Sequence, residues 1–243
     1  TTVTFSAIDS LGNVGSNTAM VTIEDQTAPA VIAPGAITVA AADANGTLAT
    51  DAAIVTFLAG ASATDNVDSD LSITNNAPTT FPLGTTEVTF SATDSSDLTG
   101  TATAMLTVTD QTAPVLDVPA AIIVAATDAD GTAASDATIA AFLSGATATD
   151  NVDTNVSVTN DGLSIFPLGS TVVSFTASDT AGNESTATVT ISVEDQTGPL
   201  ISVPSSAVVA ATDGSGTLAT DPDIVAFLAS ASAVDNVDVD VVV

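Results

Sequence analysis

The chain has 243 residues and carries 29 acidic side chains but no Lys, Arg or His, which gives a formal net charge of −29 at neutral pH. Nucleic-acid binding is excluded because phosphate contacts need basic side chains, and the absence of Cys excludes disulfides and zinc–thiolate sites. No apolar run approaches the ~18 residues of a membrane-spanning helix, so no membrane insertion is expected, whereas an apolar content of 45% favours packed domains.

An internal repeat sets the organisation of the chain. Asp-Gln-Thr recurs at Asp25, Asp110 and Asp195, and successive copies are 85 residues apart. A fixed period of this kind indicates tandem domains. We expect four parts: the C-terminal part of a repeat (1–26), two complete repeats (27–111 and 112–196) and the N-terminal part of a further repeat (197–243). The sequence therefore has the form of a segment of a longer array.

Taken in chain order, the complete repeat at 112–196 begins with an apolar, β-branched stretch at 114–126. This stretch predicts an edge strand with a kink at Pro119, because proline cannot donate to a β-ladder. Asp128–Gly131 is then predicted to be a turn, in which the glycine supplies a positive φ.

A short helix is predicted after this turn. Ser135 or Asp136 can act as its N-cap, and Ile139, Phe142 and Leu143 recur at helical spacing. The other copies carry the same pattern, so we expect one short helix per repeat.

Stretches with Thr and Val at alternate positions follow the helix: Ala146–Thr149, Val156–Thr159, Thr171–Ser178 and Thr186–Val193. Such alternation is typical of half-buried antiparallel strands, and Phe166–Gly169 predicts a tight corner between two of them. The fold class we predict is all-β, with tandem immunoglobulin-like antiparallel β-sandwiches. The eight Phe recur at three positions of the repeat, so we assign them to the core rather than to a binding surface.

Asp residues also recur at fixed positions of the repeat. In a sandwich, the loops Asp150–Asn155 and Asp179–Asn183 lie at the end where the linker Asp110–Pro114 enters, so their oxygens should converge at each junction between repeats. The candidate ligands are Asp25, Asp65, Asn66, Asp68, Asp94, Asp110, Asp150, Asn151, Asp153, Asp179, Asp195, Asp235, Asn236 and Asp238.

Several carboxylates within a few Å of one another would repel by several kcal/mol. Hard oxygen ligands in this number suit Ca²⁺, which accepts six to eight of them in flexible geometry, better than Mg²⁺. The alternative is that these Asp and Asn residues form turns by hydrogen-bonding their own backbone. We favour that alternative for Asp43, as a turn residue, and for Asp51, as a helix cap.

Several motifs together resemble a known family. Ala148-Thr-Asp-Asn151, Phe166-Pro-Leu-Gly169 and Asp179-Thr-Ala-Gly-Asn183 are similar to the hyalin repeat, an immunoglobulin-like module of extracellular and bacterial surface proteins. The Asp110-Gln-Thr-Ala-Pro114 junction resembles linkers of giant bacterial adhesins, which implies Ca²⁺ between domains.

Two departures from the hyalin-repeat pattern stand out. The disulfide cysteines and the core Trp of the family are absent. Asp97 and Leu98 replace the Gly-Asn found at Gly182-Asn183, so the site that contains Asp94 is expected to differ in its ligands or affinity.

These features favour a non-catalytic, extracellular or cell-surface structural array, a filament or an adhesin stalk, stiffened by Ca²⁺ at its junctions. The alternative is an adhesive module that recognises sugar or protein, although Trp, Tyr and basic residues are absent. An enzyme is disfavoured because His, Lys and Cys are missing. The expected partners are neighbouring repeats of the same or identical chains. These include end fragments of adjacent copies that complement one another, either through covalent continuation or by strand addition.

Overall fold

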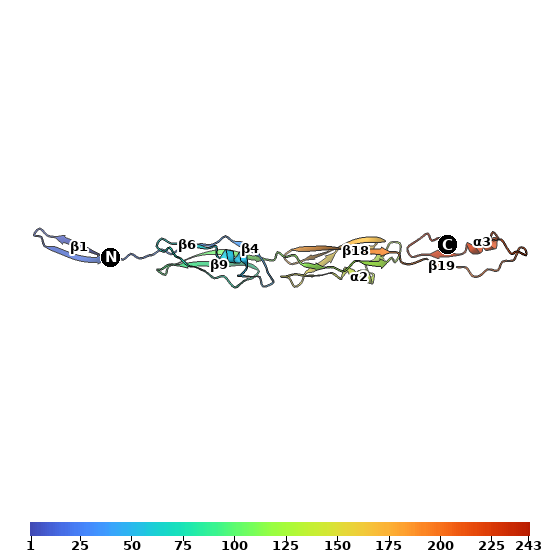
Figure 1. Ribbon diagram of the computed structural model, residues 1–243, viewed down its shortest axis with the longest axis horizontal. Coiled ribbons are helices and arrows are strands. Elements are labelled where there is room, and N and C mark those ends of the chain that lie inside the picture. Colours follow the sequence, from blue (N-terminus) through green and yellow to red (C-terminus); the bar gives the residue numbers. More distant parts are fainter. The chain divides into compact units, whose positions relative to one another are not determined.

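A computed structural model describes residues 1–243, which form two units, Thr1–Gln111 (unit 1) and Thr112–Val243 (unit 2). The boundary lies between Gln111 and Thr112. Unit 1 starts with a hairpin of β1 (Thr2–Ile8) and β2 (Val14–Met20). Unit 2 ends with β19 (Leu200–Ser202), helix α3 (Pro222–Leu228) and β20 (Ser232–Val234) (Figure 1).

Each unit contains one sandwich. In unit 1 its strands are β3 (Ala30–Ile32), β4 (Ile37–Ala40), β5 (Thr47–Leu48), β6 (Ser62–Thr64), β7 (Ile73–Asn75), β8 (Thr80–Phe81), β9 (Gly84–Thr93) and β10 (Thr99–Thr109). In unit 2 they are β11 (Val115–Asp117), β12 (Ile122–Ala125), β13 (Thr132–Ala133), β14 (Thr147–Thr149), β15 (Ser157–Asn160), β16 (Ile165–Phe166), β17 (Gly169–Ser178) and β18 (Glu184–Glu194).

The two sandwiches have the same topology. Each has one four-stranded sheet, in the order β4-β10-β9-β7 or β12-β18-β17-β15. Each also has two short antiparallel pairs, β3–β6 with β5–β8, or β11–β14 with β13–β16. The predicted alternating stretches thus correspond to β14, β15, β17 and β18, whereas the short pair β13–β16 was not predicted.

The alternation of residue types along β17 explains the core. Val173, Phe175 and Ala177 are at most 1% exposed, and the residues between them are less buried. Phe142 contacts Phe175 edge-to-face, with ring centroids 5.6 Å apart. The assignment of Phe to the core is thus confirmed in the complete repeats.

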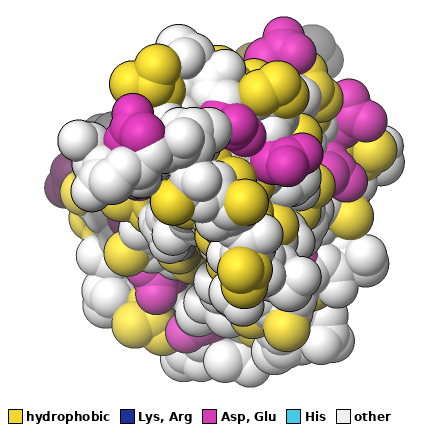
Figure 2. Space-filling model, turned by 90° about the vertical axis from the view of Figure 1, so that its right-hand side faces the viewer, with side chains coloured by type: hydrophobic (Ala, Val, Ile, Leu, Met, Phe, Trp, Pro, Cys, Tyr) yellow, Lys and Arg dark blue, Asp and Glu magenta, His cyan; other side chains and the backbone are white.

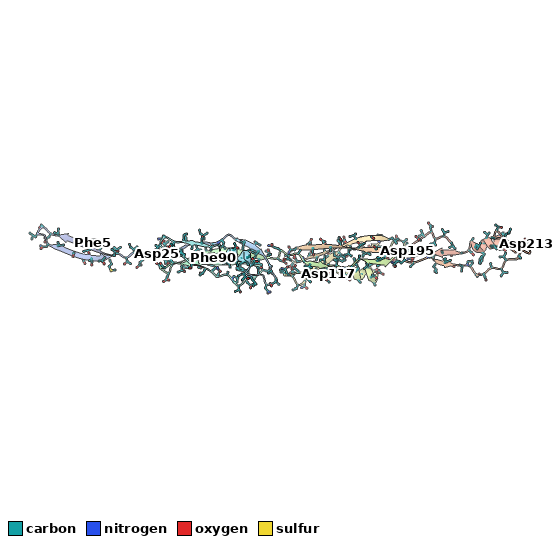
Figure 3. The ribbon with its side chains drawn as sticks, in the orientation of Figure 1. Phe5, Asp25, Phe90, Asp117, Asp195 and Asp213 are labelled. Carbon is teal, nitrogen blue, oxygen red and sulfur yellow. The ribbon has the colours of Figure 1, made fainter.

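The hairpin of unit 1 has a different environment. Phe5 on β1 is 64% exposed, whereas Phe90, at the equivalent position of β9, is fully buried (Figure 3). The β1–β2 hairpin is similar in sequence to Glu87–Thr93 of β9 and Thr99–Met105 of β10, but it forms a two-stranded sheet with no helix over Phe5.

The predicted short helix is present in all three copies, as α1 (Ala52–Leu58), α2 (Ala137–Leu143) and α3. Asp136 Oδ1 caps α2 by accepting hydrogen bonds from Thr138 N at 2.9 Å and Ile139 N at 3.3 Å. Asp51 caps α1 in the same way, which confirms the interpretation of Asp51. None of these helices has the length and hydropathy needed to span a bilayer.

The predicted kinked strand at 114–126 is two strands. β11 pairs antiparallel with β14, and β12 pairs parallel with β18, so the chain changes sheet in the stretch that contains Pro119. In this respect the sandwich differs from the expected antiparallel pattern. Alternation along a strand predicts which side chains are buried, but it carries no information on the partner of an edge strand.

Candidate metal centre

Three carboxylates that are far apart in the sequence converge in unit 1. Asp25 precedes β3 (Figure 3), Asp65 follows β6 and Asp94 follows β9. One carboxylate oxygen from each residue lies within 4.8 Å of the corresponding oxygens of the other two. Convergence of the linker with these two loops is the arrangement that the sequence predicted.

The two oxygens of each carboxylate in this group have different roles. Oδ1 of Asp65 accepts hydrogen bonds from Val67 N at 2.8 Å and Asp68 N at 3.1 Å. Oδ1 of Asp94 accepts from two backbone N–H groups, both at 2.9 Å, and Oδ1 of Asp25 accepts from one at 3.1 Å. Oδ1 therefore fixes each loop in a turn.

The second oxygen accepts nothing. Oδ2 of Asp25, Asp65 and Asp94 is shielded from solvent and has no hydrogen-bond partner, and Asp94 as a whole is only 7% exposed. Buried carboxylate oxygens are normally compensated by a donor or a cation. The turn interpretation accounts for one oxygen of each residue and leaves the other unexplained.

The chain supplies no basic side chain that could compensate these oxygens. On the face presented in Figure 2, Asp and Glu side chains lie among apolar and neutral ones with no basic side chain beside them. Two unit charges about 4–5 Å apart repel by roughly 3–4 kcal/mol at an effective dielectric constant of about 20. Three hard oxygens held at this spacing fit Ca²⁺, which binds carboxylates and tolerates irregular geometry.

A second group lies in unit 2, where Asp150, Asp153 and Asp179 also offer oxygens within 4.8 Å of one another. Asp150 repeats the arrangement of Asp65, with Oδ1 bonded to two backbone N–H groups and a buried Oδ2 that has no partner. Both oxygens of Asp153 accept from Thr180, whose N and Oγ1 lie 2.8–2.9 Å away.

Asp179 is held by Asn183. Its Oδ1 accepts from Asn183 N and its Oδ2 from Asn183 Nδ2, both at 2.7 Å. Desolvation acts to raise the pKa of the Asp179 carboxyl, but the bonds from Asn183 and from the N–H groups of Gly182 and Ala181 outweigh it, so the pKa lies below its ordinary value. Asp9 has the same partner in Asn13, whose side-chain and backbone bonds lower the pKa of Asp9.

A third group in unit 2 consists of Asp195, Asp235 and Asp238. Asp195 is exposed, and its Oδ1 accepts from Thr197 N at 3.0 Å. The backbone N–H groups of Val237 and Asp238 lower the pKa of Asp235 against a smaller opposing effect of desolvation. This group is more open to solvent than the group in unit 1.

The remaining predicted ligands lie in the linkers and loops that carry these groups. Asp68 lies outside the unit 1 group, and its Oδ2 accepts from Ser95 N at 3.3 Å and Ser95 Oγ at 3.0 Å. Asp110 follows β10 directly, and Asn66 and Asn151 lie in the loops after β6 and β14. Asn236 Nδ2 donates to the carbonyl oxygen of Ala126 at 2.9 Å.

The residues that donate hydrogen bonds to these carboxylates, Ser95, Thr180 and Asn183, were not among the predicted site residues. Thr180 and Ser95 follow a strand-end Asp directly, and Asn183 is the last residue of the Asp-x-x-Gly-Asn motif. That spacing is a signal that could have identified Asn183 as a donor, because a side-chain amide four residues after an Asp in a tight turn can reach its carboxylate. Asp43, by contrast, forms the predicted turn, and its Oδ1 accepts from Asn45 N at 2.7 Å.

Residues 109–193 match the HYR domain family. Hyalin of Lytechinus variegatus is 36% identical over 215 residues, which cover 84% of this chain and 39% of that protein. Hyalin of Strongylocentrotus purpuratus is 35% identical over 218 residues, 86% of this chain and 17% of that protein. The chain thus spans less than half the length of these relatives.

Among solved structures, the protocadherin GammaB4 extracellular domain is similar, with a TM-score of 0.37 and 17% identity over 84% of this chain and 40% of that one. Drosophila N-cadherin EC1-4 gives a TM-score of 0.35 and 14% identity over 70% of this chain and 50% of that one.

Proposed function

Because the chain is a hyalin-repeat-like protein, we propose that its repeats form a stalk or filament in which Ca²⁺ stiffens the junctions. The protein is extracellular or at the cell surface, and it is an adhesion-related repeat module. Proteins of this kind are in general not enzymes. In this proposal, carboxylates at the junctions bind the cation and the repeats serve a structural role.

One observation carries the proposal. Asp25, Asp65 and Asp94 each present a buried Oδ2 that accepts no hydrogen bond, in a group whose ligand atoms lie within 4.8 Å of one another. Oδ1 of each residue is already bonded to backbone N–H groups, so the loops hold the carboxylates together in spite of their repulsion. A divalent cation would satisfy the three open oxygens and remove that repulsion.

The position of Asp25 in the predicted linker supports a site at the junction between repeats. Asp25 stands at the end of the partial repeat 1–26, and its partners Asp65 and Asp94 belong to the complete repeat at 27–111. By the 85-residue period, Asp110 and Asp195 occupy the position of Asp25 in the later copies. A cation bound by the linker and by two loops of the next repeat would immobilise that linker.

The stabilisation expected from Ca²⁺ is large for a small domain. A ligand present at 100 times its Kd stabilises the folded state by about 2.7 kcal/mol. Domains of this size have total stabilities of roughly 5–10 kcal/mol, so chelation should lower the melting temperature clearly.

The deciding experiment is a thermal melt of the chain and of Asp94→Asn, each in Ca²⁺ and in excess EDTA. Asn keeps the shape and the Oδ1 acceptor but removes the charge. In Ca²⁺ the substitution should lower the melting temperature because a ligand is weakened. In EDTA it should raise the melting temperature because one repelling charge is gone.

Asp43→Asn is the matched control, since Asp43 occupies a turn outside all three groups. Its effect should be the same in Ca²⁺ and in EDTA. The calcium proposal is wrong if EDTA leaves the melting curve of the unsubstituted chain unchanged, or if Asp94→Asn has the same effect under both conditions.

The segments 1–26 and 197–243 could link this chain to further repeats of the array. Phe5 and Phe227 stand at the positions of Phe175 and Phe142, which pack against each other in the complete repeat of unit 2. We propose that segments equivalent to 1–26 and 197–243 complete a sandwich together, by covalent continuation or by non-covalent complementation between copies.

A further inference from the structure

In unit 2, the loop Asp235–Asp238 of the partial repeat contacts the end of the complete repeat at 112–196. Asn236 Nδ2 donates a 2.9 Å hydrogen bond to the carbonyl oxygen of Ala126, the residue after β12. Val237 packs against the core cluster that includes Val124 and Ala126. The Val237 side chain and the Asn236 hydrogen bond thus both contact the end of β12.

The same loop occurs in unit 1 as Asp65–Asp68, which provides a comparison inside one chain. Val67, the counterpart of Val237, is 62% exposed, whereas Val237 is half-buried. The burial of Val237 thus accompanies its contact with the end of the preceding repeat.

The contact uses no carboxylate oxygen. The donor is a side-chain amide, the acceptor is a backbone carbonyl, and the second element is an aliphatic side chain. The contact uses the amide nitrogen, whereas a cation would bind the amide oxygen. The oxygen of the same amide, Asn236 Oδ1, contacts Thr197 Oγ1 in the linker that enters the partial repeat.

We propose that the Asn-Val pair of each Asp-Asn-Val-Asp loop is a docking surface for the end of the preceding repeat, and that this contact orients adjacent repeats without a cation. The exposed Asn66-Val67 pair is then the corresponding surface for the end of another repeat of the same kind. This inference goes beyond the calcium proposal, because it assigns the Asn236 amide nitrogen and the Val237 side chain to the interface between repeats.

The absence of Cys allows spin labels to be placed at will. Thr188→Cys in β18 and Ala226→Cys in α3, both at exposed positions, form a label pair across the contact. The distance distribution is measured in the full chain by double electron–electron resonance, in excess EDTA so that no divalent cation contributes. Loss of a small interface lets domains move independently, so Asn236→Asp with Val237→Ser should broaden the distribution at least about twofold.

Asn236→Asp separates the two roles of this position. Aspartate keeps an oxygen that can bind a cation, but it lacks the amide donor and carries a charge toward the Ala126 carbonyl. The matched control is Asn66→Asp with Val67→Ser, which makes the same changes in the corresponding loop of unit 1, away from the labelled contact, and should leave the width unchanged. A label pair at Ser202→Cys and Ala226→Cys reports whether the partial repeat keeps its own structure.

Two results would overturn the proposal. The first is an unchanged distribution in the Asn236→Asp, Val237→Ser chain while the partial repeat stays intact. The second is an unsubstituted chain that is broad in EDTA and becomes narrow only with Ca²⁺, because the cation alone would then orient the repeats. Failure of the calcium proposal is read separately, from the melts in Ca²⁺ and EDTA.

Discussion

Asn183 closes the loop after β17 by donating hydrogen bonds to both oxygens of Asp179, through its backbone N and its Nδ2. The preceding repeat has Leu98 at the position of Asn183, and there Asp94 Oδ2 has no donor. The two copies therefore differ in one side-chain hydrogen bond, and this bond competes directly with a cation for the second carboxylate oxygen.

Introducing the missing donor should weaken cation binding in unit 1. We expect Leu98→Asn to satisfy Asp94 Oδ2 in the metal-free state and to lower the affinity for Ca²⁺ about five- to tenfold, since the bond contributes about 1 kcal/mol. Isothermal titration calorimetry measures this directly. Leu98→Ala, which adds no donor, is the control. An unaltered affinity in Leu98→Asn would show that Asp94 Oδ2 is not a ligand.

The backbone of the same loop offers a stabilising substitution. Asp97 has a φ of 64°, whereas Gly12 and Gly182 at the equivalent positions have φ of 88° and 89°. A left-handed conformation costs a non-glycine residue about 1–2 kcal/mol, which the larger entropy loss of Gly on folding partly offsets.

Asp97→Gly should therefore raise the free energy of unfolding by about 0.5–1 kcal/mol, as measured by urea denaturation. The converse change, Gly182→Ala, should destabilise unit 2, and only through the backbone, because no atom lies within 4 Å of the added Cβ. Stabilisation by both substitutions would contradict the assignment of backbone strain.

Two equivalent phenylalanines should differ sharply in their contribution to stability. Phe90 is fully buried and contacts Phe57 at a centroid distance of 5.9 Å, so Phe90→Ala should cost about 3–5 kcal/mol. Phe5 is 64% exposed, and Phe5→Ala should change the stability of a dilute sample by less than about 0.5 kcal/mol.

Self-association at high protein concentration provides a second test of the role of Phe5. If terminal fragments of adjacent copies complement one another without a covalent link, sedimentation should detect self-association at high concentration, and Phe5→Ala should abolish it. Self-association that is insensitive to Phe5→Ala would exclude this route.

The pKa of Asp179 leads to a prediction about acid unfolding. Its folded pKa is lowered, so its contribution to stability is present above the unfolded value of about 3.9 and is lost as the pH falls through the folded value. Asn183→Ala removes the side-chain donor and brings the folded pKa closer to the unfolded one.

We therefore expect Asn183→Ala to be less stable than the unsubstituted chain near pH 6, with the two melting-temperature curves converging below about pH 3.9. The melts are recorded in EDTA to exclude cation effects. Asn155→Ala, in a neighbouring exposed loop, is the control: its melting temperature should depend on pH in the same way as that of the unsubstituted chain. Curves that diverge toward low pH would contradict the assigned role of Asn183.

The parts of the fold that follow local rules could be predicted from the sequence. Thr-Val alternation predicted β17 and β18, and the Asp136 cap with Ile139 and Phe142 predicted α2, because both signals depend only on near neighbours. The parallel pairing of β12 with β18 could not be predicted in this way. It depends on where the chain changes sheet after Pro119, which no local periodicity encodes.

The candidate site shows a similar division. The positions of Asp25, Asp65 and Asp94 at strand ends, together with the period, predicted that they converge. They did not predict that Oδ1 of each carboxylate accepts from backbone N–H groups while Oδ2 accepts no hydrogen bond. Nor could the sequence assign the donor role of Asn236, because its acceptor, Ala126, is 110 residues away. Long-range hydrogen bonds of this kind require the packed structure.

The parallel ladder between β12 and β18 affects how the repeat resists a pulling force applied to its two ends. The chain enters the repeat ahead of β12 and leaves it after β18, and the two strands are joined at four paired positions, from Ile122–Ile191 to Ala125–Glu194. Because the strands run in the same direction, a pull on both ends of the repeat slides one strand past the other. Such shear loads all four rungs at once, whereas an antiparallel pair would open one rung at a time. An array of these repeats should therefore yield only at high force.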